Sequence, residues 1–215
     1  MTEPNRKDRT MRLYNLHLIT EDDCDEVGMP LLSPEDIAIT ECSLVSFKAK
    51  PNPGAGAHFF HEDYAFEGTW KDPERYVSML SKFAFTLTPD FSCFLDMPEP
   101  MQRWNIYRSR AVGKIWQDAG LCVIPTVSWG LENTYQFAFD GIPEASTVCF
   151  SSVGLMRCNE GKQVFREGAE AACEYLKPKK ILCYGVPCDF DAMGAEVAWF
   201  ETDMQKRFNE IKKGR

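Results

Sequence analysis

Carboxylates follow two apolar segments of this sequence, each at the point where a predicted strand ends. Glu62 and Asp63 come after the first of these segments, and Asp90 follows the second. Two carboxyl groups within reach of each other can divide the work of a general acid and a general base. We therefore predict Asp63 and Asp90 as a catalytic pair, with Glu62 beside them. The competing interpretation is structural: both aspartates cap the helices that follow, or Asp90 pairs with Arg108.

The same carboxylates could hold a divalent metal ion that activates water. His58 lies at the start of the same polar segment, and imidazole binds metals together with carboxylates. His61 is three residues further on, so the two rings point to opposite faces unless the strand ends between them. The predicted metal ligands are therefore His58, Asp63 and Asp90, and the cofactor that they would hold is a divalent metal ion.

A predicted long helix carries two arginines that could clamp a phosphate or a carboxylate, because a guanidinium donates to two oxygens at once. Arg108 falls on the apolar stripe of this helix, and Arg110 follows it. A buried guanidinium needs an acceptor, and we expect a carboxylate at a strand end to supply it. Asn105 on the same helix is predicted to orient a ligand. The structural alternative is an ion pair for Arg108 and a solvated Arg110.

Hydroxyl and indole groups follow two later strands. Ser128 and Ser152 are predicted to orient a ligand, and Trp129 is predicted to stack against a base or a sugar ring. Neither serine lies in the Gly-x-Ser-x-Gly turn of a nucleophilic serine, so covalent catalysis is not favoured. The structural alternative for Trp129 is packing in the core.

These side chains can meet only if the strands are parallel and neighbouring, since their carboxyl ends then share one edge. Apolar strands are predicted to begin near residues 58, 83, 121, 147 and 180, which is a spacing of about 25 to 38 residues, with another over 37–47. Such spacing fits βα units. A complete eight-fold barrel needs about 250 residues. The predicted fold is therefore a mainly parallel α/β fold forming a distorted or incomplete barrel, and the alternative is an open doubly wound sheet.

Proline, glycine and apolar spacing predict the other elements. The sequence predicts a short extended segment over 11–20 and a loop over 51–57. Helices are predicted over 73–82, 98–120, 132–139, 161–176 and 192–212. We predict one domain over 1–215, with an N-terminal extension over 1–50, a core over 57–185 and a C-terminal helix over 191–213.

Composition limits the classes of function. The formal net charge of −8 and the pI near 5.0 argue against non-specific binding to a nucleic-acid backbone. No apolar run approaches the roughly 20 residues that span a bilayer, and the first ten residues lack a signal-peptide core. The odd count of nine cysteines fits a reducing compartment. We expect a cytoplasmic protein that partners a small polar ligand or a host protein and not a membrane.

Seven short motifs resemble a known family. They lie at residues 58–64 (His-Phe-Phe-His-Glu-Asp-Tyr), 66–70, 89–92 (Pro-Asp-Phe-Ser), 96–98, 104–110 (Trp-Asn-Ile-Tyr-Arg-Ser-Arg), 123–129 (Val-Ile-Pro-Thr-Val-Ser-Trp) and 139–143. This order resembles the family called domain of unknown function 4417, over about residues 57–185. The resemblance implies a phage, prophage or other mobile-element context and implies no particular activity.

Two hypotheses follow. The first is an enzyme, for example a hydrolase, that transforms a small polar ligand such as a nucleotide or a sugar phosphate through the carboxylates at the strand ends. The alternative is a non-enzymatic accessory protein that binds a host protein or sequesters a small signalling molecule. Thermal stabilisation by nucleotides or divalent ions would favour the first, because a ligand that binds only the folded state stabilises it.

Overall fold

Parallel strands form two sheets in the computed structural model, which describes residues 6–39 and 42–213. The four-stranded sheet has the order β1-β2-β3-β4, and the three-stranded sheet has the order β5-β6-β7. Every neighbouring pair is parallel. The strands are β1 (Ser43–Ser46), β2 (Ala55–His58), β3 (Phe85–Leu87), β4 (Val123–Ile124), β5 (Thr147–Ser151), β6 (Lys180–Tyr184) and β7 (Glu196–Phe200).

A short parallel bridge between Thr126 and Cys149 joins the two sheets. Val127 donates its N–H to the carbonyl of Cys149 at 2.9 Å, and Cys149 donates to the carbonyl of Pro125 at 2.9 Å. The strands therefore follow one another in chain order from β1 to β7. Within the described residues no pairing joins β7 to β1, so the barrel is not closed. The predicted parallel α/β fold with an incomplete barrel-like form is confirmed.

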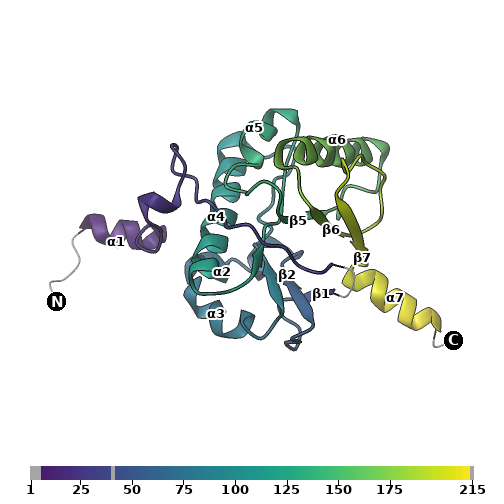
Figure 1. Cartoon of the computed structure of the whole chain (residues 1–215), viewed down its shortest axis with the longest axis horizontal. Coiled ribbons are helices and arrows are strands. Elements are labelled where there is room, and N and C mark those ends of the chain that lie inside the picture. Colours follow the sequence, from purple (N-terminus) through teal and green to yellow (C-terminus); the bar gives the residue numbers. More distant parts are fainter. Residues whose placement is uncertain (1–5, 40–41, 214–215) are drawn as a thin grey trace.

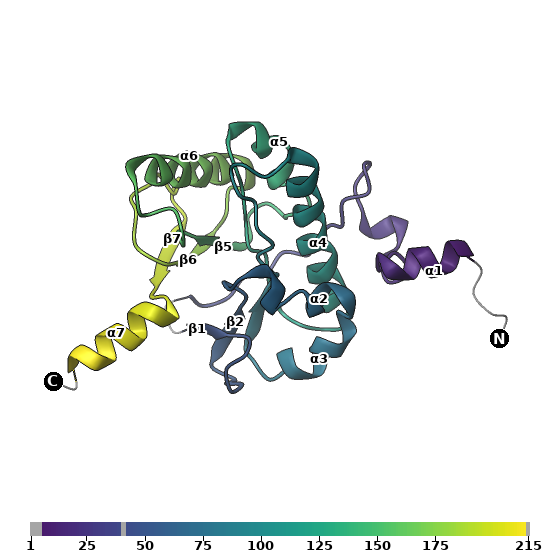
Figure 2. The ribbon, with the colours of Figure 1, turned by 180° about the vertical axis from the view of Figure 1, so that it is seen from behind.

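Helices lie outside this curved sheet, because each parallel connection must cross over it. Figures 1 and 2 show α2, α3 and α4 along one side and α6 along another, while α1 and α7 project from opposite ends. The helices are α1 (Arg6–Leu13), α2 (Gly68–Lys71), α3 (Glu74–Leu80), α4 (Glu99–Asp118), α5 (Tyr135–Ala138), α6 (Asn159–Leu176) and α7 (Asp203–Lys213). Short 3-10 turns are η1 (Glu21–Asp23), η2 (Asp63–Ala65) and η3 (Glu132–Thr134).

The core has an inner and an outer part because side chains alternate along each strand. The inner cluster holds Leu44, Phe85, Leu87, Ile124, Cys149, Leu182 and Tyr184, all facing the concave side. Their neighbours along the strands face outward instead. On the outside, Ala57 and Val123 pack with α4, while Val148 and Cys183 pack with α6.

Gly56 in β2 permits the close packing of the inner surface. A Cβ atom at this position would lie 2.2 Å from the ring of Phe85 on the neighbouring strand. No side chain larger than that of glycine fits without moving the Phe85 ring.

The prediction of a C-terminal helix over 192–212 is wrong for the first half of that range. Residues 196–200 form β7, and the helix begins at Asp203. Val197 and Trp199 face α6, while Ala198 and Phe200 face the inner cluster, which is the period-two pattern of a strand.

Three further boundaries differ from the sequence expectations. Residues 55–57 belong to β2 and not to a loop, because Ala and Gly are small enough to lie between β1 and β3. The segment predicted as extended over 11–20 instead contains the end of α1, a helix with no buried residue. The strand predicted over 37–47 is limited to β1, and residues 40–41 lie outside the described residues.

All nine cysteines are free thiols. Of the helices in the described part of the chain, none is both long and apolar enough to cross a bilayer.

Candidate functional site

A pocket of about 520 Å³ opens at the carboxyl ends of β2, β3, β4 and β5. Loops that follow these four strands supply all of its walls, as parallel α/β folds dictate. Its lining residues are Phe60, His61, Glu62, Asp90, Ser92, Cys93, Phe94, Leu95, Val127, Ser128, Trp129, Ser151, Val153, Gly154, Leu155 and Arg157. Four predicted site residues therefore meet here: Glu62, Asp90, Ser128 and Trp129.

Asp90 and Ser128 form the polar centre of this pocket. The hydroxyl of Ser128 donates to Oδ1 of Asp90 at 2.6 Å, which links the loops after β3 and β4. Burial raises the pKa of Asp90 to about 6, opposed by the Ser128 hydrogen bond and assisted by the negative charge of Asp63. Near neutral pH the Asp90 carboxyl group can therefore accept a proton or donate one.

Asp63 lies at the same end of the sheet, at the start of η2. Its carboxylate accepts the backbone N–H of Ser92 at 3.2 Å and the hydroxyl of Ser92 at 2.7 Å. Ser92 lines the pocket, whereas Asp63 is not among the lining residues. Asp63 therefore holds the pocket loop and acts on Asp90 through its charge.

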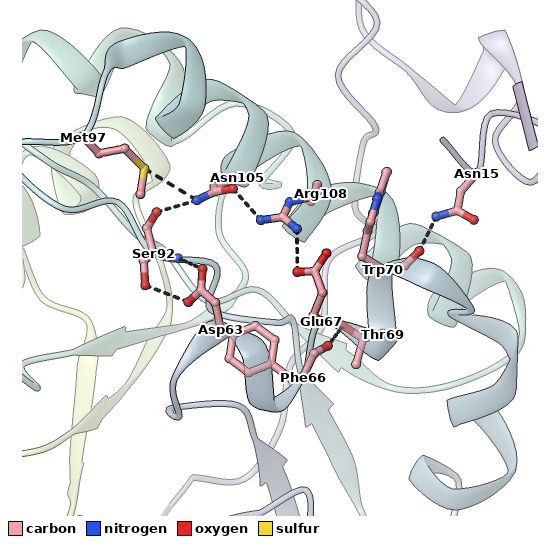
Figure 3. Close-up of polar contacts among 10 residues, drawn as sticks. All are labelled: Asn15, Asp63, Phe66, Glu67, Thr69, Trp70, Ser92, Met97, Asn105 and Arg108. Carbon is pink, nitrogen blue, oxygen red and sulfur yellow. Dashed lines mark hydrogen bonds and ion pairs between the residues drawn. The ribbon is translucent and has the colours of Figure 1, made fainter. Parts of the chain in front are cut away.

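Arg108 and Asn105 approach the same loop from α4 (Figure 3). Arg108 donates to Oε2 of Glu67 at 2.9 Å and to Oδ1 of Asn105 at 2.6 Å. Asn105 in turn donates to the carbonyl of Ser92 at 2.6 Å. The Arg108 guanidinium also lies 3.8 Å from the ring centre of Phe91. The acceptor predicted for Arg108 is thus a carboxylate, but it is Glu67 and not Asp90, and neither Arg108 nor Asn105 lines the pocket.

Arg110 is fully buried, so the alternative of a solvated Arg110 is wrong. Its guanidinium donates to the backbone carbonyls of Thr126, Ala138 and Asp140 at 2.9 to 3.2 Å. These contacts occupy the side chain and tie the segment after α5 to the end of β4. Arg110 therefore lies where it cannot reach a ligand in the pocket.

Trp129 and Ser152 differ in their access to the pocket. Trp129 lines it, and its indole N–H donates to the carbonyl of Val164 in α6 at 3.2 Å. A Cβ atom at Gly168 would lie 2.0 Å from this indole nitrogen, so glycine is needed there. Ser152 is buried and does not line the pocket. Its hydroxyl donates to the carbonyl of Val186 at 2.8 Å, which joins the loop after β5 to the loop after β6.

His58 is directed away from both aspartates of the predicted metal set. Its Nδ1 accepts the N–H of Phe60 at 3.3 Å, and its Nε2 lies 3.6 Å from Oδ1 of Asp203 at the start of α7. Burial lowers the pKa of His58 to about 4, so the ring is neutral at pH 7. In the described part of the chain, no three His, Cys, Asp or Glu side chains are grouped to bind a metal. The structure does not assemble the ligand set of His58, Asp63 and Asp90.

Arg157, Phe94 and Cys93 are among the pocket residues that sequence reasoning missed. Arg157 lies exposed in the loop after β5 and makes no hydrogen bond or ion pair with any residue the structure describes. Phe94 is a largely exposed ring on the opposite loop. Burial raises the pKa of Cys93 to about 12, so its thiol is neutral and is no nucleophile at pH 7. The sequence signal that could have pointed to these residues was Arg157 itself, a lone arginine in the polar turn after an apolar strand.

The family model described as Domain of unknown function (DUF4417) matches residues 25–201. This chain belongs to the DUF4417 family. The resemblance found in the sequence motifs is therefore confirmed, and the matched range contains all seven strands and every residue of the pocket. Both α1 and α7 lie outside it.

Two phage proteins are similar to this DUF4417 chain. Each is called Gene 1 protein, one from Mycobacterium phage L5 and one from Mycobacterium phage D29, and each is 42% identical over 132 residues. The match covers 61% of this chain, 58% of the L5 protein and 49% of the D29 protein. The chain thus spans about half the length of the curated relatives it matches. No solved structure matches it.

Proposed function

We propose that this chain is an enzyme that hydrolyses or otherwise transforms a small polar ligand by acid–base chemistry at Asp90. The observation that carries the proposal is a carboxyl group whose pKa is raised to about 6, in a pocket at the carboxyl ends of parallel strands. Perturbed carboxyl groups in such pockets are common at catalytic sites. Ser128 fixes the orientation of this carboxyl group through its 2.6 Å hydrogen bond.

The walls of the pocket favour a ligand that has both an anionic part and a ring. Arg157 is the cation of the lining and has a guanidinium free to bind phosphate or carboxylate oxygens. Trp129, Phe60 and Phe94 supply aromatic surface on which a base or a sugar can pack. A nucleotide or a sugar phosphate combines these features.

Asp63, Asn105 and Arg108 take a supporting part in this proposal. They bind the loop that carries Asp90 and Ser92 and make no contact with the pocket interior. Their loss would loosen the loop and would not remove a proton donor or acceptor.

The test begins with a thermal-shift screen of nucleotides and sugar phosphates, each with and without Mg²⁺, since a ligand of the folded state raises the melting temperature. Turnover of each ligand that stabilises the protein is then measured in wild type and in Asp90→Asn. Loss of a general acid–base group lowers the rate by about 10² or more. The matched control is Glu74→Gln, which removes an exposed carboxylate on α3, far from the pocket.

The result decides between the two hypotheses. A ligand that is turned over by wild type and Glu74→Gln but not by Asp90→Asn supports the enzyme. A ligand that binds equally well to wild type and Asp90→Asn without turnover supports the non-enzymatic binding protein instead.

A further inference from the structure

Helix α7 carries a largely exposed apolar stripe, and the Nζ of Lys212 lies 4.5 Å from the centre of one of its rings, that of Phe208. Met204, Phe208 and Ile211 recur at the spacing that places them on one helical face. Their exposed fractions are 80%, 58% and 62%. Figures 1 and 2 show this helix projecting from the body. Exposed apolar faces of this kind mark sites of association.

The first turn of α7 fixes the direction in which the helix projects. Asp203 donates its N–H to the hydroxyl of Tyr184 at 3.0 Å, and Lys206 donates to the carbonyl of Leu44 at 2.7 Å. Thr202 and Gln205 cap the helix through reciprocal hydrogen bonds. The apolar stripe is therefore presented in a defined orientation and is not a disordered tail.

The charge of α7 is opposite in sign to that of the whole chain. The helix has four basic and two acidic side chains, in a chain of formal net charge −8. Its partner should therefore present an acidic surface around an apolar groove. The acidic remainder of the chain would repel the extended negative charge of a nucleic acid or an anionic membrane, whereas a protein can present a small acidic patch to α7 alone.

Such a surface exists on this chain, in a second cavity of about 830 Å³ between α5, α6 and the segment at 25–31. Its apolar part includes Leu31 and Tyr175, which are about half exposed, and the Phe139 ring lies 5.7 Å from that of Tyr175. Its acidic part is formed by Asp25, Asp140, Glu144 and Glu174, and the cation Lys177 lies in the same lining and pairs with Glu144 at 3.3 Å, which leaves an excess of negative charge. We call this cavity the α5–α6 cleft.

We propose that α7 of one copy docks into the α5–α6 cleft of a second copy. Phe208 and Ile211 would pack against Tyr175 and Leu31, while the basic side chains of α7 meet the acidic rim. The two surfaces are different patches of the chain, and Figures 1 and 2 show α7 directed away from α5, so the contact is head-to-tail. A helix of 11 residues is only about 16 Å long, so the interface is small, weak and sensitive to salt.

The test is sedimentation velocity of the full chain from about 10 μM to about 500 μM, at low and high salt, a range suited to small interfaces. Wild type should show mass that grows with concentration and falls with salt. The helix variant Phe208→Ser with Ile211→Ser, and the cleft variant Glu174→Lys with Tyr175→Ser, should each remain monomeric. Tyr64→Ser removes an even more exposed ring elsewhere and should behave as wild type.

Mixing the two variants decides the geometry. Each retains one intact surface, so an equimolar mixture should form a dimer that grows no further. All four substituted residues of these variants are exposed, so melting temperatures near that of wild type should show that both variants fold. A wild type that stays monomeric at every concentration overturns the proposal. Continued self-association of the cleft variant also overturns it, because α7 would then bind another surface.

Discussion

The hydroxyl of Ser128 donates a 2.6 Å hydrogen bond to the carboxyl group of Asp90, across the ends of two neighbouring parallel strands. This contact joins residues 38 positions apart in the chain and lies in the wall of a pocket. It also opposes the effect of burial, which raises the pKa of Asp90 to about 6. The proposed acid–base chemistry depends on the balance between burial, which raises the pKa of Asp90, and the Ser128 hydrogen bond, which lowers it.

Replacing Ser128 should make Asp90 harder to ionise. Ser128→Ala removes a hydrogen bond that favours the charged form, so the pKa of Asp90 should rise further above its ordinary value of 3.8. A ¹³C NMR titration of the carboxyl group measures this directly. Ser151→Ala is the matched control, because Ser151 lines the same pocket without bonding to Asp90. An unchanged titration in Ser128→Ala would mean that the hydrogen bond is absent in solution.

Asp63→Asn should shift the same titration in the opposite direction. The negative charge of Asp63 raises the pKa of Asp90, so the neutral amide should lower it. An asparagine oxygen can still accept one of the two Ser92 hydrogen bonds, the one from the hydroxyl, which keeps part of this anchor of the loop. The midpoint of any pH–rate profile governed by Asp90 should move with the pKa. A profile that stays fixed would show that the two carboxyl groups do not interact.

Asp90 should lower the stability of the fold at neutral pH. Its pKa is about 6 in the folded chain and 3.8 ordinarily, so the folded state binds more protons between these values and stability falls as pH rises through that window. The cost at pH 7 is on the order of 2 kcal/mol after allowance for the partial exposure of the side chain.

Asp90→Asn should therefore melt at a higher temperature than wild type at pH 7, with the gain vanishing toward pH 4, while any turnover is lost. His58 titrates in an overlapping range with the opposite sign, because burial lowers its pKa to about 4 and stability falls as pH falls from 6.5. Taking the difference between wild type and variant cancels this contribution. A lower melting temperature for Asp90→Asn at pH 7 would identify Asp90 as a structural residue.

Arg108→Met should destabilise the fold by about 1–3 kcal/mol, because it leaves Asn105 and Glu67 without a partly buried donor. The control is Lys177→Met, whose exposed pair with Glu144 is worth at most about 1 kcal/mol. Denaturant unfolding measures both variants. Equal effects would show that the network drawn in Figure 3 contributes little to holding the pocket loop.

The positions of Asp90 and Ser128 follow from the sequence because apolar strands at regular spacing predict parallel neighbours, whose ends share an edge. β7 could not be recognised in the same way. Val197, Phe200, Met204 and Phe208 recur at three and four residues, which is a helical spacing, although the first two lie on a strand. Pairing with β6 decided the conformation, and single-chain periodicity does not contain that information.

The partners of the arginines were beyond sequence reasoning for a related reason. Several carboxylates precede Arg108, and only the packing of α2 against α4 selects Glu67. Arg110 is satisfied by backbone carbonyls, which every residue carries and which leave no sequence signal. The place of Arg157 in the pocket was also not predictable, because it depends on the path of the loop after β5.

The most direct test of the central claim is the titration of the Asp90 carboxyl group in the wild-type chain, followed by ¹³C NMR between pH 3 and pH 8 and assigned with Asp90→Asn. The account predicts a midpoint near 6, well above the ordinary 3.8. It also predicts that a ligand bound in the pocket will shift this midpoint. A midpoint near 3.8 that no pocket ligand moves would contradict the claim that Asp90 is poised for proton transfer.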